Sequence, residues 1–338
     1  MQGLGDNIHQ RAVIAQIIGR GRDVWLTTPW PSVYFDFNHR LFLRPASSHL
    51  RTQSKNEIRE AARYHGAEPP PLCDHLSVRY TPDGVRRHGS VVAAMLSQCG
   101  CDPTQYDFRF PALPYEWHRS IRPILDRARG CPILIYRPLV VRVEWGGCEA
   151  RNPDRDAYAE LLASFRSRFF LISIADLVPR FEWITSHPVV ADLEFHHGEL
   201  CFEHLAALFA EATLVYTAQG FAGALAQAVG TASITVFGGY ENSSSISLGA
   251  RLSPTLAIDP IQPCNCWRHD HSCKKAIDIP AAIRRIEDFI NAIADYQQGR
   301  DWGVANRTQR LANALHEPGG AGSPDRSDAT GPAPADGG

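Results

Sequence analysis

The sequence predicts an α/β protein built in two successive halves, each with short apolar strands joined by helices. Three observations predict this class: apolar β-branched runs alternate with helical patterns, glycines stand where the helices should end, and the composition is globular. Hydrophobic residues make up 44% of the chain and charged residues 21%, and 338 residues suffice for two domains with full cores. The formal charge of -2 gives no general attraction to nucleic acid or anionic membrane.

The element with the clearest pattern is Ala212–Tyr240, in which two apolar runs flank a helix of small residues. Thr213–Tyr216 and Ser233–Phe237 read as buried strands, and Ala222–Val229 is rich in the helix formers Ala and Leu. Gly230 is placed to stop that helix. A strand–helix–strand unit of this kind builds a parallel sheet, and ligands bind at the carboxyl edge of open parallel sheets.

The glycine turn of this unit is a candidate anion site. The helix that starts beside Gly220 offers free backbone N–H groups and the positive end of its dipole, which suit a phosphate. The alternative is a plain strand–helix–strand unit whose glycines only serve tight turns.

The other elements follow in order from a first helix, which starts at the glycine turn before Asp6 and has apolar residues at helical spacing through Ile18. A doubly wound domain normally has a strand before such a turn. We expect that this strand is missing from the sequence, the alternative being that the domain starts irregularly. Arg40–Lys55 is basic and polar, and reads as a solvated loop or the lining of a cleft for an anionic acceptor. Further strands are expected at Asp23–Thr28, Val33–Phe37, Leu76–Tyr80, Pro132–Tyr136, Arg168–Ala175 and Val189–Phe195, and further helices at Asn56–Tyr64, Gly89–Cys99, Ser120–Arg129, Asp156–Ser167, Phe202–Glu211 and Ile279–Tyr296.

The domain boundary is expected just after Arg129, because a new strand follows it. Residues 1–129 and 130–317 are then two Rossmann-like domains that face each other across a cleft. Residues 318–338 consist mainly of Gly, Pro, Ala, Ser and Asp and should be disordered, because they cannot bury a core.

The sequence also predicts a cytoplasmic protein. No apolar run approaches the roughly 20 residues of a membrane span, and the N-terminus lacks the apolar core of a signal peptide. Its nine cysteines are therefore expected to be thiols rather than disulfides.

Three stretches carry a resemblance to a known family: Gly5-Asp6 at the head of the first helix, His204–Phe237, and the Cys-rich loop Cys264–Cys273 before the helix from Ile279. The chain resembles the heptosyltransferase-type glycosyltransferases of family 9, which have the GT-B fold. This resemblance implies transfer of a sugar from a nucleotide sugar to an acceptor hydroxyl, with inversion and without a bound metal or cofactor. It suggests an acceptor in a cell-surface glycan of the lipopolysaccharide kind.

The chain departs from the family at the glycine turn, which usually reads Asp-Ser-Gly-Pro-x-His there. An ungapped comparison places Gln219–Ala224 at these positions, so the acidic residue and the His are both absent. Contacts to the donor phosphates would then come mainly from backbone N–H groups.

Glycosyl transfer needs a base for the acceptor hydroxyl and positive charge or N–H groups for the departing diphosphate. Asp6 is the candidate base, with an N-capping role as the alternative, and Gly5 and Asn7 are expected beside the acceptor. Arg137, Arg142 and Arg151 follow the first strand of the second half and can pair with a diphosphate, unless they form surface ion pairs. The residues expected to bind the donor are Arg137, Arg142, Gln219, Gly220, Phe221, Gly238, Gly239 and Tyr240.

The loop Cys264–Cys273 contains ligand types that suit zinc. Its Cys-x-Cys spacing is not the usual one, and no second pair is evident, so the sequence favours free thiols and no metal.

Two rival functions remain open from the sequence. One is a glycosyltransferase that acts on a nucleobase or small molecule. The other is a catalytically silent binding protein, which the changed turn favours and the retained Gly5-Asp6 opposes.

Overall fold

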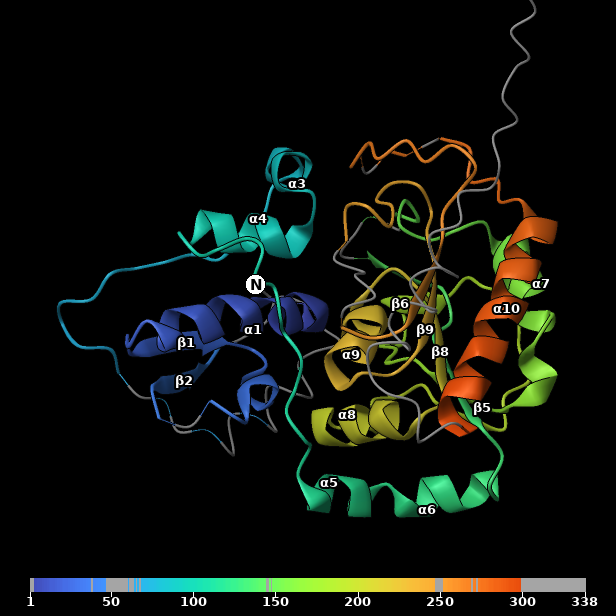
Figure 1. The fold of residues 1–338 in the computed structure, drawn as a ribbon, viewed down its shortest axis with the longest axis horizontal. Helices are drawn as coiled ribbons and strands as arrows, with labels where there is room; N and C mark the ends of the chain where they lie inside the picture. Colours follow the sequence, from blue (N-terminus) through green and yellow to red (C-terminus); the bar gives the residue numbers. More distant parts are fainter. Residues whose placement is uncertain are drawn as a thin grey trace, which may run out of the picture.

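The computed structural model describes residues 3–37, 39–46, 60, 64, 66, 68–143, 146, 148–246, 252–268, 270, 271 and 273–298. Two α/β portions lie side by side: the first contains α1, β1, β2, α3 and α4, and the second contains the main sheet (Figure 1). The predicted α/β class is confirmed. Within the part of the chain described, no helix is long and apolar enough to span a membrane.

The second half is organised around a six-stranded parallel sheet in the order β10-β9-β8-β3-β5-β7. In chain order this is the Rossmann arrangement 3-2-1-4-5-6, whose switch point lies between its first and fourth strands, here β3 and β8. The strands are β3 (Ile133–Tyr136), β5 (Phe170–Ile174), β7 (Leu193–Phe195), β8 (Leu214–Ala218), β9 (Ser233–Val236) and β10 (Thr255–Ile258).

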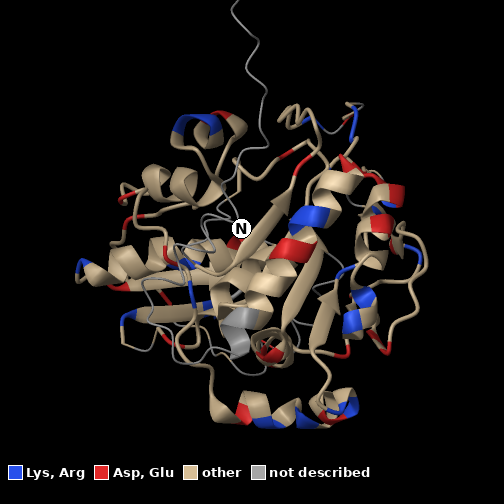
Figure 2. Cartoon of the chain, turned by 45° about the vertical axis from the view of Figure 1, so that its right-hand side comes forward, with Lys and Arg blue, Asp and Glu red and all other residues tan. Residues whose placement is uncertain are grey.

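Helices cover both faces of this sheet. Helices α8 (Phe202–Glu211) and α9 (Phe221–Val229) lie on the face toward the first half, and α7 (Arg155–Ala163) and α10 (Ile279–Gln298) lie on the other (Figure 1). Strands β3, β5, β8, β9 and β10 contain no charged residue (Figure 2). Such apolar runs are typical of parallel strands buried on both faces.

The predicted strand–helix–strand unit is confirmed as β8, α9 and β9. Helix α9 begins after Gly220 and ends at Gly230, whose φ of 82° is in the left-handed region that glycine adopts without strain. Strand β8 pairs in parallel with both β3 and β9.

The first half has less sheet. Helix α1 (Leu4–Gly19) packs beside β1 (Val24–Thr28), which pairs in parallel with β2 (Leu41–Pro45), and these two strands are its sheet within the described residues. The short helices α3 (Pro82–His88) and α4 (Val91–Gln98) follow. The limits of the two domains and the missing first strand stay predictions.

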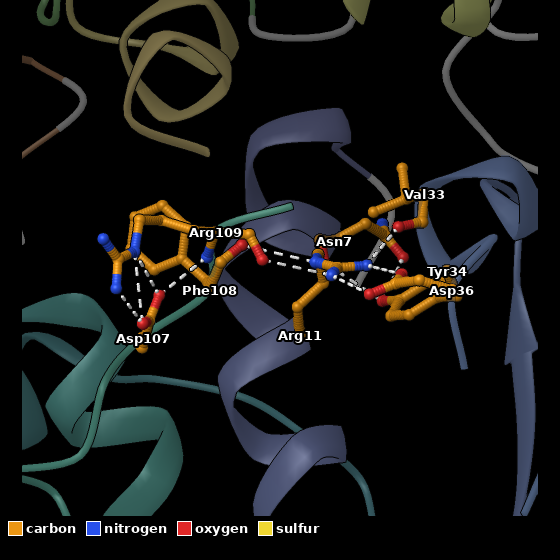
Figure 3. Close-up of polar contacts among 8 residues, drawn as sticks. All are labelled: Asn7, Arg11, Val33, Tyr34, Asp36, Asp107, Phe108 and Arg109. Atoms are coloured by element: carbon orange, nitrogen blue, oxygen red, sulfur yellow. Dashed lines mark hydrogen bonds and ion pairs between the residues drawn. The ribbon is translucent and has the colours of Figure 1, made fainter. Parts of the chain in front are cut away.

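A buried arginine ties the first half together (Figure 3). Arg11 on α1 is 2% exposed, and it donates two hydrogen bonds to Asp36, at 2.7 and 2.8 Å. It also donates to the carbonyl of Val33 at 2.6 Å and to the carbonyls of Phe108 and Arg109 at 3.3 and 3.2 Å. Arg11 therefore links α1 to two other segments of the first half, one around Val33 and Asp36 and one at Phe108 and Arg109.

Several predicted elements of the first half are wrong. Val33–Phe37 is not a strand, because the 3₁₀ helix η1 (Pro31–Tyr34) starts at a proline and buries its side chains. Leu76–Tyr80 is extended but pairs with no strand among the described residues. Arg40–Lys55 is not wholly a loop, since β2 occupies its first part.

The helix expected at Ser120–Arg129 is divided into α5 (Tyr115–Ser120), α6 (Arg122–Leu125) and η3 (Asp126–Ala128). Pro123 accounts for a new start at α6, because proline is favoured in the first turn of a helix. The remaining short elements are the antiparallel pair β4 (Val140–Arg142) and β6 (Glu182–Ile184), and η5 (Arg166–Arg168). The disordered tail 318–338 and most of the helix Asn56–Tyr64 lie outside the described residues.

The two halves share one apolar core. It includes Ile8 of α1 and Phe110 from the first half, and Leu225 of α9 from the second. The backbone N–H of Phe110 donates to the carbonyl of Ala228 at 2.7 Å. The N-terminus of α1 touches that of α9, since a Cβ on Gly5 would lie 3.1 Å from the Cα of Phe221. The cleft between the halves is therefore closed at its base by direct packing.

Candidate functional site

A cavity of about 490 Å³ lies between the two halves. This volume is within the range of pockets that hold small organic ligands. Its walls come from the start of α1, the segments after β3 and β8, and the segment after β9. The charged and aromatic side chains that line it include Asp6, His9, Tyr80, Arg137, Arg142, Arg151, Phe221 and Tyr240.

Two helix N-termini meet at the cavity. Helix α1 begins at Leu4 and α9 at Phe221, and each follows a glycine, Gly3 or Gly220, which has no side chain to cap the first N–H groups. The close contact of Gly5 with Phe221 brings these two ends together. Both helices therefore direct the positive end of their dipole toward one place, which favours an anionic ligand.

Asp6 lies in the first turn of α1 and is half-buried at the cavity wall. Burial raises the pKa of its carboxyl, and the positive charge of Arg151 opposes that rise. A carboxylate with a raised pKa is a stronger base, which suits proton abstraction from a hydroxyl. The structure places Asp6 on the first half, opposite the cationic groups of the second half.

The positive charge of Arg151 acts on two carboxyl groups, those of Asp6 and Glu241, and lowers the pKa of both. Its Nη2 lies 3.1 Å from Oε1 of Glu241, whose side chain is fully buried, and its guanidinium lies 5.9 Å from the ring centre of Tyr240. Burial and the nearby charge of Asp6 raise the pKa of Glu241, Arg151 lowers it, and the resulting pKa is about 7. Arg151 therefore interacts both with the predicted base, Asp6, and with Glu241 in the segment after β9.

Arg137 stands at the switch point of the sheet, directly after β3. Its Nη1 donates to the carbonyl of Ile174 at 2.9 Å, and its guanidinium lies 5.4 Å from the ring centre of Phe221. Burial lowers the pKa of Arg137 to about 10, so it remains charged at neutral pH. Arg137 and the start of α9 can therefore both face a diphosphate.

Arg142 also lines the cavity but is paired with Glu182, with Nε 2.6 Å from Oε1. Both side chains are well shielded from solvent, at 16% and 2% exposed. Arg142 can contribute positive charge to the site, while its guanidinium is partly engaged by this carboxylate.

The structure brings most of the predicted site residues to one cavity, namely Gly5, Asp6, Arg137, Arg142, Gln219, Gly220, Phe221 and Tyr240. Asn7 is fully buried instead, and its Oδ1 accepts a hydrogen bond from Thr28 at 2.6 Å. Gly238 and Gly239 are absent from the lining. A Cβ on Gly238 would lie 2.4 Å from the carbonyl oxygen of Asn152, so this glycine permits the loop of Arg151 to pack against the end of β9.

Among the lining residues that the sequence did not predict are His9 and Tyr80. Burial lowers the pKa of His9 to about 4, and its Nε2 makes no hydrogen bond within the described part of the chain. The spacing of three residues from Asp6 on one helix could have indicated His9. Burial raises the pKa of Tyr80 and Arg151 opposes the rise, but no sequence signal marked this tyrosine.

A separate cluster lies beyond the segment after β9. Its members, Cys264, Cys266, His271 and Cys273, place one potential metal-ligating atom each within 4.8 Å of all the others. None of the four lines the cavity. None of the nine cysteines, all of which lie among the described residues, is in a disulfide.

This architecture is that of a GT-B-type fold, and comparison with solved structures supports it. A glycosyl transferase family 9 protein from Veillonella parvula has a TM-score of 0.55 and 13% identity, over 86% of this chain and 95% of that one. The iron-containing dodecameric glycosyltransferase TibC from enterotoxigenic E. coli has the same score and identity, over 92% and 75%. The ADP-heptose LPS heptosyltransferase II of E. coli has 0.51 and 11%, over 88% and 98%.

No family model matches the sequence, and a search of curated proteins finds no match. At these identities the structural likeness shows the fold.

Proposed function

We propose that this protein is a glycosyltransferase of the heptosyltransferase type, which moves a sugar from a nucleotide sugar to an acceptor hydroxyl. The observation that carries the proposal is the juxtaposition, across one cavity, of a carboxylate from the first half with a helix N-terminus and arginines from the second. This is the division of tasks that glycosyl transfer requires.

In the proposed reaction, the carboxylate of Asp6 accepts the proton of the acceptor hydroxyl. The acceptor oxygen then forms a bond to the anomeric carbon of the sugar while the bond from that carbon to the diphosphate oxygen breaks. The leaving nucleoside diphosphate gains negative charge, which the N–H groups at the start of α9 and the guanidinium of Arg137 stabilise. Attack from the face opposite the leaving group inverts the anomeric centre, and no metal is required because the protein supplies the positive charge.

An ADP-linked donor is the first candidate, because heptosyltransferase II, one of the structures with this fold, is described as acting with ADP-heptose. We propose that Tyr240 stacks on the base or ribose side of the donor, since its ring borders the cavity beside Arg151. The proposed acceptor is a hydroxyl of a cell-surface glycan, and the proposed compartment is the cytoplasm.

The rival function is a silent binding protein of the same fold, which the changed turn Gln219–Ala224 favours. Thermal-shift measurements with ADP-, GDP-, UDP- and CMP-linked sugars test the proposal, because a ligand that binds the native state raises its melting temperature. We expect one nucleotide class to give a clear rise that Arg137→Met abolishes. Absence of a shift with every donor contradicts the proposal. A shift without any release of nucleoside diphosphate, even with glycan acceptors, supports the rival.

A further inference from the structure

The loop after β10 gathers three cysteines and a histidine into one cluster. Cys264 and Cys266 stand in its first part, and His271 and Cys273 stand further along, toward α10. The three Sγ atoms and one ring nitrogen all lie within 4.8 Å of one another. The return of the chain therefore supplies the second pair of ligands that the spacing of the first two cysteines did not reveal.

Two distances within the cluster are close to those between ligands of one tetrahedral ion. The Nδ1 atom of His271 lies 3.1 Å from Sγ of Cys266 and 3.4 Å from Sγ of Cys264. Metal–sulfur bonds of about 2.3 Å and metal–nitrogen bonds of about 2.0–2.1 Å in a tetrahedron place sulfur about 3.5 Å from nitrogen. Small side-chain movements would bring all four atoms into coordination range.

The backbone of the loop is bent around the cluster. Asn265 and Trp267, on either side of Cys266, have φ values of 48° and 58°, in the left-handed region that residues other than glycine seldom adopt. Such conformations persist where the surroundings impose them. The N–H groups of these two residues donate to the carbonyls of Gly239 and Tyr240, at 2.8 and 3.3 Å, so the loop is fastened to the segment after β9.

We propose that Cys264, Cys266, His271 and Cys273 bind one tetrahedrally coordinated, thiophilic metal ion. Three thiolates and one imidazole form a ligand set of structural zinc sites, and tetrahedral sulfur-rich sites also accept iron. The shared chemistry is a thiolate-bound ion with no open position, so its role is structural.

The site would fix one wall of the cavity. Trp267 lies between two cavity-lining tyrosines, with its ring centre 5.8 Å from that of Tyr240 and 6.3 Å from that of Tyr80. Tyr240 belongs to the second half and Tyr80 to the first. An ion that holds the loop would therefore hold the aromatic contact that spans the two halves.

Metal analysis of the full chain, purified under reducing conditions without chelator or a metal-binding tag, tests the proposal directly. We expect about one zinc or iron per chain, because structural sites of this type bind tightly at neutral pH. The ratio of the two metals identifies the ion. Removal of the metal and refilling with Co²⁺ should produce the intense thiolate-to-cobalt absorption of a tetrahedral site.

The variant Cys264→Ser with Cys273→Ser should reduce the bound metal to background. The control Cys131→Ser, an exposed cysteine outside the cluster, should keep it. Wild-type protein that holds no metal above background and gives no cobalt–thiolate band overturns the proposal. A mass lower by two hydrogens, with a disulfide mapped to this loop in freshly purified protein, also overturns it. The wild-type measurements do not depend on whether the variants fold.

Discussion

Different interactions stabilise each of the two halves of the molecule. The second half has a six-stranded parallel sheet covered by helices on both faces, and its central strands carry no charge. The first half has two paired strands within the described residues and depends on the hydrogen bonds of one buried arginine, Arg11. The sheet half can present ligand-binding loops on a rigid edge, whereas the first half is shaped by a few polar contacts and by the core it shares with α9.

This difference suggests how the site is divided. The parts that would hold a donor, Arg137 and the start of α9, stand on the switch point of the sheet. The proposed base, Asp6, stands on α1, whose position depends on Arg11 and on the contact between Gly5 and Phe221. Donor binding should therefore tolerate damage to the first half better than catalysis does.

The largest expected effect comes from Arg11→Met. Loss of one partner leaves the carboxylate of Asp36 without its ion pair, and removal of one member of a buried pair costs about 3–5 kcal/mol of unfolding free energy. The matched control is Arg109→Met, since Arg109 pairs with Asp107 at 2.6 Å but both side chains are about half exposed, at 49% and 55%. The control should lose about 1 kcal/mol or less. Urea unfolding measures both variants, and equal losses would contradict the assignment of Arg11 as the organising contact.

The second prediction concerns pH and Glu241. Because burial raises the pKa of Glu241 from 4.5 to about 7, the folded protein retains this proton over a range in which the unfolded chain has lost it. The unfolding free energy should therefore fall as pH rises from 4.5 to 7, by as much as roughly 3 kcal/mol, and stay level above that range. In Glu241→Gln this contribution should disappear. Identical pH profiles of wild type and variant, measured by urea unfolding in steps of pH, would show that Glu241 does not titrate in this way.

The third prediction concerns the contact between the loop of Arg151 and the end of β9. A methyl group at Gly238 would collide with two backbone carbonyls, those of Asn152 at 2.4 Å and Arg151 at 2.9 Å. Backbone atoms cannot move aside as a flexible side chain does, so Gly238→Ala should lose about 1–3 kcal/mol. Gly19→Ala is the control, because nothing lies within 4 Å of the added atom at the end of α1. Thermal unfolding compares the two, and a stable Gly238→Ala would show that the loop can shift.

The sequence predicted the second half better than the first for a physical reason. Buried parallel strands such as β3, β8 and β9 are short apolar runs bounded by glycines, so their pattern is local. The first half is defined by contacts across long separations, such as Arg11 with the carbonyl of Phe108, which no local pattern contains. Val33–Phe37 was mistaken for a strand for a local reason, since the apolar pattern was read without the effect of Pro31, which begins the 3₁₀ helix η1.

The candidate site shows the same contrast. Residues that follow a strand, such as Arg137 and Gln219, could be placed at one sheet edge from the sequence, and the structure brings them to one cavity. Asn7 was misplaced because helical position alone does not reveal that its side chain turns inward to Thr28. Tyr80 was not found, because its segment was expected as a strand, whereas it pairs with no strand among the described residues and brings the ring to the cavity.

The central claim is that Asp6 acts as the base of a sugar transfer across the cavity. The most direct measurement compares wild type with Asp6→Asn for two quantities: donor affinity, and the rate of nucleoside diphosphate release from the donor that stabilises the protein. The account predicts that the rate falls about 10²–10⁴-fold while the dissociation constant changes little, because a general base contributes that factor to the reaction and the donor contacts lie on the other half. Asp126→Asn, a surface exchange beside Arg122, serves as the control and should keep the wild-type rate. An unchanged rate in Asp6→Asn would contradict the account.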